Sequence, residues 1–315
     1  MRCFLTTMLT MALMAVAQAQ VINSINDEIM RRGFDKAIRQ EQQEKQGKKK
    51  NRKTELTVPI DTTTLYFTLI DSAQVRLDAR DWAGAEAFIM KALESDPANP
   101  NNSLLLSNLA TVQRYQGKND EAIKNYTMAL DMTPNAVTLL RNRAVLLVAV
   151  GRTDEARADY DRILLLEPLD TEALYNRGLI KLDGGDTAGA NDDFEKILRI
   201  DPSSGLGHQG LATLHKLKGN YEKAISHYND AIKEGATAQL LANRADCHLA
   251  SRHLSEASED IASALQLDAD DPFLYVLRAK LNKLRYNFDD MNRDIELAEK
   301  HGIDRATVKQ LLEVK

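Results

Sequence analysis

Small and bulky apolar residues recur along most of the chain at a fixed spacing. Between Leu139 and Ser204 one arrangement occurs twice, 34 residues apart. It has a small residue at the eighth position of the unit, another at the twentieth and a bulky apolar residue at the twenty-fourth. A period of this length is typical of a solenoid of stacked helix pairs. Extended in both directions, the pattern places small residues at position 8 of seven units: Ala73, Ala110, Ala144, Gly178, Ala212, Ala245 and Ala279.

Each unit is predicted to form two antiparallel helices, A and B. Small residues at positions 8 and 20 let the two backbones approach, and the residue at position 24 fills the space beside them. Glycine at position 15 of repeats two to five ends helix A in the left-handed region, and prolines close repeats one to four. Repeat seven departs from the pattern because Met291 occupies position 20 and Tyr286 occupies position 15. Repeats one to seven span 66–99, 103–136, 137–170, 171–204, 205–237, 238–271 and 272–305.

The combination of paired small residues, a position-24 aromatic and a closing proline resembles the tetratricopeptide repeat (TPR). The resemblance implies an all-α, right-handed α-solenoid of stacked helix pairs. It also implies a concave groove, lined by the A helices, that binds a protein or peptide. We expect Tyr175 to be the main contact there, with packing between repeats as the alternative. Carrying over positions 2, 5, 9 and 12 gives the predicted partner-binding set: Arg114, Arg141, Val145, Tyr175, Leu179, Lys216 and Lys280.

Two positions vary together within the array. Position 7 is arginine in four repeats, and position 23 is aspartate in the same four. Because these positions lie on facing helices A and B, the pattern predicts a salt bridge inside each of these repeats. We expect removal of the aspartate alone to be costly wherever the arginine is buried. The predicted pairs are Arg143–Asp159, Arg177–Asp193, Arg244–Asp260 and Arg278–Asp294.

The first 19 residues have the features of a secretory signal peptide. Arg2 precedes an apolar run, and small residues at Ala17 and Ala19 come before Gln20. We expect cleavage after Ala19 and a periplasmic or secreted protein. An uncleaved anchor is the alternative, although the run is shorter than the roughly 20 residues that span a bilayer.

Residues 20–65 and 306–315 flank the repeats. The first segment is predicted to be a short helix followed by a basic flexible linker that includes the run from Lys48 to Lys53. The run is interpreted either as a solvated linker or as a contact for an anionic lipid or polymer. The last segment is predicted to be a C-terminal capping helix, with Asp304 as its N-cap.

Charge separates the leader from the array. Residues 1–65 carry a net charge of +4, so the remaining residues carry −9 of the chain's total of −5. An acidic array argues against nucleic acid as its ligand. The predicted groove is the exception, because its cations outnumber its two anions, Glu172 and Asp246. We therefore expect a partner segment with apolar anchors and acidic flanks.

No catalytic, cofactor or metal-binding motif is recognisable. The chain has no phosphate-binding glycine loop, zinc-type cysteine pairs or serine elbow. His208, His215 and His248 are interpreted as ordinary helix-surface histidines, and Cys247 as a small packing residue. The resulting hypothesis is a non-enzymatic scaffold acting outside the cytoplasm, without cofactor or membrane span and with a monomer favoured. The alternative is an envelope-surface adaptor that docks through its basic arm.

Overall fold

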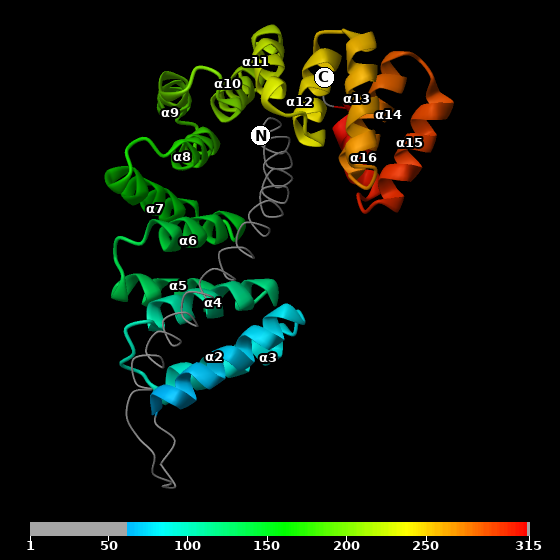
Figure 1. Cartoon of the computed structure of the whole chain (residues 1–315). Helices are drawn as coiled ribbons and strands as arrows, with labels where there is room; N and C mark the ends of the chain where they lie inside the picture. Colours follow the sequence, from blue (N-terminus) through cyan, green and yellow to red (C-terminus); the bar gives the residue numbers. More distant parts are fainter. Residues whose placement is uncertain (1–61, 314–315) are drawn as a thin grey trace, which may run out of the picture. The chain divides into compact units, whose positions relative to one another are not determined.

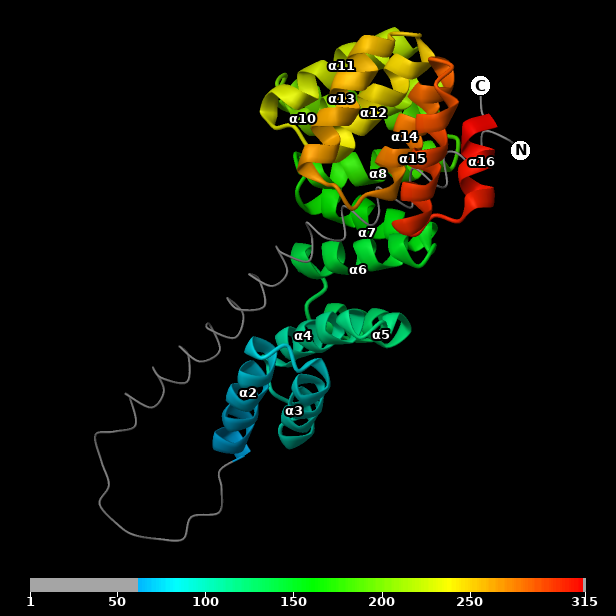
Figure 2. The ribbon, with the colours of Figure 1, turned by 90° about the vertical axis from the view of Figure 1, so that its right-hand side faces the viewer.

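The computed structural model describes residues 62–313, and every regular element in that range is an α-helix. The expectations for the signal peptide, the short helix and the basic linker lie outside the described residues. The helices divide into two units, one ending at Leu166 and the other starting at Glu167. Each unit consists of antiparallel helix pairs (Figures 1 and 2), so the predicted all-α solenoid fold class is confirmed. Between residues 62 and 313 no helix is long and apolar enough to cross a bilayer.

The first unit contains three helix pairs, which are the A and B helices of repeats one to three. Its core includes Tyr66, Ile70 and Ile89, none of which is more than 1% exposed. The pairs are α2 (Thr62–Asp78) with α3 (Trp82–Ser95), α4 (Asn102–Tyr115) with α5 (Asn119–Met132), and α6 (Val137–Ala149) with α7 (Thr153–Leu166).

The second unit contains repeats four to seven and a final single helix. Its pairs are α8 (Thr171–Asp183) with α9 (Thr187–Ile200), α10 (Gly205–Leu217) with α11 (Tyr221–Glu234), α12 (Ala238–Ala250) with α13 (Leu254–Leu267), and α14 (Pro272–Leu284) with α15 (Phe288–Lys300). Helix α16 (Arg305–Glu313) follows and packs against α14 and α15. Asp304 accepts a hydrogen bond from the Thr307 amide at 3.0 Å and thereby caps α16, whose Val308 and Leu312 are buried.

The small residues lie where the two helices of a repeat meet. Every alanine at positions 8 and 20 is fully buried, and the position-24 side chains are at most 3% exposed. Repeat four shows how tight this contact is. A Cβ atom added to Gly178 would lie 2.5 Å from the Phe194 ring, and one added to Gly210 would lie 2.3 Å from it. Phe194 therefore requires glycine on both α8 and α10.

Position 15 adopts the left-handed conformation in all seven repeats. The four glycines there have φ between 73° and 83°. Arg80, Arg252 and Tyr286 adopt φ of 54°, 63° and 59° at the equivalent positions, although each carries a Cβ atom. The turn geometry is thus set by the packing of the helices, and three repeats adopt it with a residue that is less suited to it.

Candidate interaction surface

The structure brings together all four arginine–aspartate pairs. In repeats three, four and six the contact is bidentate, with Nε and Nη2 of the arginine each donating to a different carboxylate oxygen at 2.5–2.9 Å. In repeat seven Arg278 uses one oxygen of Asp294, and Asn282 donates to the other at 2.9 Å. Hydrogen bonding to Asp159 raises the pKa of Arg143, which keeps the guanidinium charged.

The aspartate is the buried member of each pair. The four aspartate side chains are 5–7% exposed, whereas the arginine side chains are 19–36% exposed. Removal of the aspartate alone is expected to be costly where the arginine is buried, and the arginine is the more exposed member of each pair. In repeat three, loss of the arginine leaves a carboxylate without its cation in a position that water hardly reaches, whereas in repeat four Lys181 also pairs with Asp193 at 2.8 Å. Loss of the aspartate leaves an arginine that can turn toward solvent.

Tyr175 does not line an open groove. Its side chain is buried, with 2% exposure, and its ring centroid lies 6.0 Å from that of Phe194. Burial raises the pKa of the Tyr175 hydroxyl above its ordinary value, and the hydroxyl has no hydrogen-bond partner among the described residues. The interpretation of Tyr175 as an exposed binding contact is therefore wrong, and packing within and between repeats accounts for it.

Two of the predicted groove lysines share one aspartate. Lys216 on α10 and Lys280 on α14 each place Nζ 2.9 Å from a carboxylate oxygen of Asp246 on α12, between them. All three side chains are 16–22% exposed, and Lys216 also donates to Asn243 at 3.2 Å. The two neighbouring cations hold the pKa of Asp246 well below its usual range, in spite of burial. We call these three residues the lysine–aspartate row.

The remaining predicted groove residues are half-buried. Arg114 lies on α4, with its guanidinium 5.4 Å from the centroid of the Tyr115 ring. Arg141 and Val145 lie on α6, and Leu179 on α8. Asp246, one of the two anions expected in the groove, pairs with both Lys216 and Lys280, so these three residues carry a net charge of +1. Lys283, on α14, donates to the Leu312 carbonyl at 2.7 Å and so holds α16 in place.

Cys247 and His248 are packing residues rather than a reactive pair. Cys247 is fully buried, and burial raises the pKa of its thiol to about 12. His248 lies beside His253, with 3.5 Å between their Nδ1 atoms, and 3.9 Å from Asp260. His208 and His215 instead contact His227, a contact that the sequence pattern does not predict. The signal that could have singled out His227 is that it replaces the position-23 aspartate found in the repeats on either side of it.

Comparison with known proteins identifies the family. The sequence profile of the tetratricopeptide repeat matches residues 107–164, 142–205 and 210–272, about half of the chain. A tetratricopeptide repeat protein from Parabacteroides merdae ATCC 43184 is 35% identical; the match covers 79% of this chain and 98% of that one, with a TM-score of 0.69. The chain belongs to the tetratricopeptide repeat family. A TPR fold indicates a scaffold for protein–protein interactions.

More distant structures share the fold of this TPR chain. PilW, a type IV pilus biogenesis factor, is 23% identical over 66% of this chain and 94% of its own, with a TM-score of 0.53. PilF of Pseudomonas aeruginosa is 21% identical over 70% of this chain and 99% of its own, also with a TM-score of 0.53. No curated protein sequence matches the chain.

Proposed function

We propose that this TPR chain is an exported, non-enzymatic scaffold that binds an acidic protein segment on the A helices of its second unit. The lysine–aspartate row is the observation that carries the proposal. Its two lysines and one carboxylate leave one positive charge in excess on three A helices, at side chains that are only 16–22% exposed. A charge in such a position gains more from a partner anion than a fully solvated lysine does.

An apolar residue on a neighbouring A helix supports the choice of partner. Leu179, on α8, is half-buried, and α8 packs against α10, the helix of Lys216. A segment with an apolar anchor and an acidic flank would complement both features. The row is also already ordered by its own ion pairs, so little side-chain entropy is lost when a partner binds.

Selection of peptides from a random library on the full chain tests the proposed binding surface. The selected peptides should be rich in Asp and Glu beside an apolar residue. Lys280→Gln should weaken their binding about tenfold or more, because a half-buried charge partner is lost. Lys300→Gln is the matched control, since Lys300 is exposed on α15, a B helix of the same repeat. The proposal fails if selected peptides are not acidic, or if both variants bind them as the wild type does.

Export is tested separately. The proposed signal peptide predicts a mature chain that begins at Gln20 when the protein is produced in a Gram-negative host with its leader intact. Intact mass spectrometry of the extracytoplasmic fraction should show this mass. A chain that retains Met1, or one found only in the cytoplasm, would contradict export without affecting the proposed binding surface.

A further inference from the structure

Repeat five departs from the rest of the array at three positions. Position 4 is leucine in five repeats but His208 in repeat five. Position 23 is aspartate in four repeats but His227 here, and position 26 carries aspartate only here, as Asp230. Each of these three replacements introduces a side chain that can bind a metal ion.

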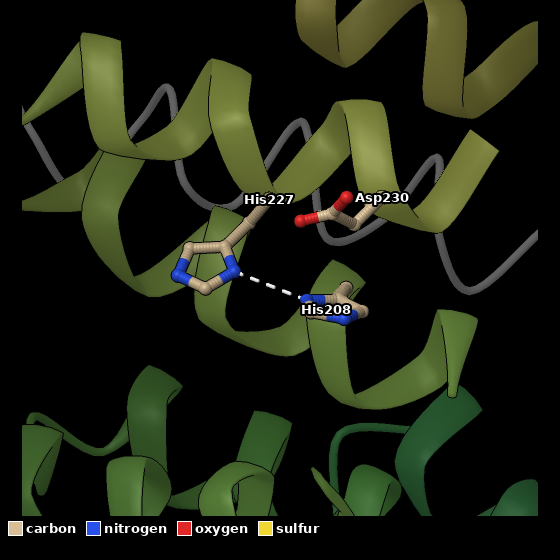
Figure 3. A group of neighbouring side chains, drawn as sticks. All are labelled: His208, His227 and Asp230. Carbon is tan, nitrogen blue, oxygen red and sulfur yellow. Dashed lines mark hydrogen bonds between the residues drawn. The ribbon is translucent and has the colours of Figure 1, made fainter. Parts of the chain in front are cut away.

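The fold does bring these three side chains to one point. His208 is on α10, and His227 and Asp230 lie three residues apart on the facing side of α11. One potential ligand atom from each residue lies within 4.8 Å of the other two. Figure 3 shows the Asp230 carboxylate beside the two imidazole rings, with a dashed line between one nitrogen of each ring. All three residues are partly exposed, so an ion can reach them from solvent.

The spacing of the two rings suits a tetrahedral ion. The Nδ1 atoms of His208 and His227 are 3.2 Å apart. Two nitrogen ligands at about 2.0–2.1 Å from a tetrahedral zinc ion are separated by roughly 3.3 Å. The two Nδ1 atoms are therefore spaced almost like two ligands of one ion, and the Asp230 carboxylate supplies a third ligand.

The other ring nitrogen of His208 already makes the hydrogen bond that is usual for a metal-binding histidine. His208 Nε2 lies 3.1 Å from the Pro202 carbonyl oxygen, which can only accept a hydrogen bond. In the neutral ring Nε2 therefore carries the proton, and Nδ1 presents its lone pair toward His227. Metal-binding histidines usually donate their other N–H to a carbonyl or carboxylate in this way.

The surroundings favour a neutral imidazole at His227. Burial, together with the neighbouring His208 and His215, lowers the pKa of His227 below its ordinary value. His215 stacks on His227 with ring centroids 5.6 Å apart. Nδ1 of His215 is buried and has no hydrogen-bond partner among the described residues. Metal ions require deprotonated nitrogen ligands, so this environment does not compete with them.

The other histidine pair shows what is special about repeat five. His248 and His253 also face each other through Nδ1, but the nearby carboxylate, Asp260, is held by two hydrogen bonds from Arg244. In repeat five the position of that arginine is occupied by Leu211. Within residues 62–313 the ion-pair partner of Asp230 is Lys233, whose side chain is 76% exposed. The Asp230 carboxylate can therefore turn to an ion at little cost.

We propose that His208, His227 and Asp230 form a binding site for a divalent transition-metal ion of the Zn²⁺ class, with one position left for water or an additional ligand. Two imidazoles and one carboxylate are a donor set that suits zinc and related ions rather than Mg²⁺ or Ca²⁺. The ion would join α10 to α11, whereas four other repeats join their two helices by an arginine–aspartate pair.

Titration calorimetry with ZnCl₂ on the full chain, without a polyhistidine tag, tests the site. One Zn²⁺ should bind per chain, and binding should weaken at acidic pH, because protons compete with the ion for the imidazole nitrogens. Co²⁺ should give the visible absorption of a tetrahedral site. Loss of a group outside the ligand shell already costs metal sites about 10–100-fold in affinity. His208→Leu should therefore lower the affinity at least about 100-fold.

The variants are chosen so that misfolding does not hide the result. Leucine is the residue that five other repeats place at position 4, so His208→Leu should melt no lower than the wild type without metal. Asp230→Asn changes a partly exposed residue and should also weaken the binding of Zn²⁺. His253→Gln is the matched control and should bind Zn²⁺ as the wild type does. The proposal is overturned if the wild type does not bind Zn²⁺ below millimolar concentration, or if His208→Leu and Asp230→Asn bind it unchanged.

Discussion

The pair Arg143–Asp159 offers a quantitative test of how the repeats are held together. Arg143 donates two hydrogen bonds to Asp159 and one to Thr127 at 2.9 Å. Asp159 is 5% exposed, and among the described residues Arg143 is its one cationic partner. Arg143→Leu leaves this buried carboxylate without a cationic partner. It should destabilise the repeat by about 3 kcal/mol, the lower end of the range for breaking a buried pair.

Loss of the aspartate charge should destabilise the repeat less than loss of the arginine. Asp159→Asn keeps one acceptor oxygen for the arginine, whose side chain is 21% exposed and can reach water. We expect a loss of about 1.5 kcal/mol, similar to one charged hydrogen bond. The double variant recreates the natural combination of repeat two, Leu109 with Asn125. It should cost only about 2 kcal/mol, which leaves a coupling energy of about 2.5 kcal/mol between the two sites.

Native-state hydrogen exchange is the appropriate assay, because stability in a repeat array is local. Amides of α6 and α7 should lose roughly 150-fold in protection in Arg143→Leu, the equivalent of about 3 kcal/mol at 1.36 kcal/mol per tenfold. Arg152→Ala, which removes an exposed pair with Glu155, is the control and should leave protection unchanged. If the two single effects simply add in the double variant, the aspartate and arginine do not act as a pair and the reasoning is refuted.

Three further results are expected. Arg252→Gly and Tyr286→Gly should each stabilise the chain by about 0.5–1 kcal/mol, because glycine relieves a left-handed conformation at an exposed side chain; a lower urea midpoint would contradict this. Gly210→Ala should destabilise by about 1–3 kcal/mol, because the new methyl group meets the Phe194 ring at 2.3 Å; a thermal midpoint equal to that of the wild type would show that the ring moves freely. Cys247, buried with its thiol pKa raised to about 12, should not react with a thiol reagent at pH 8 until urea unfolds its helix; rapid labelling in the native state would show that α12 opens readily.

Much of the fold follows from local features of the sequence. The two helices of a repeat must approach closely, and only small residues at positions 8 and 20 permit this, so the alanines can be recognised from one chain. The left-handed turn at position 15 is likewise visible through its four glycines. The arginine–aspartate pairs were predictable because both partners belong to one repeat, 16 residues apart, and seven copies show which types occur together.

Tertiary structure decided the features that depend on how a side chain is covered or how neighbouring repeats meet. Helical spacing places Tyr175 on the A-helix face, but only the structure shows that its ring is buried, 6.0 Å from that of Phe194. Sequence alone also does not show that Asp246 lies between Lys216 and Lys280, since these residues come from three repeats. The meeting of His208 with His227 depends on the side-chain conformations across one helix pair. A periodic pattern specifies which face a residue occupies, whereas its neighbours in space determine whether that residue is core, ion pair or ligand.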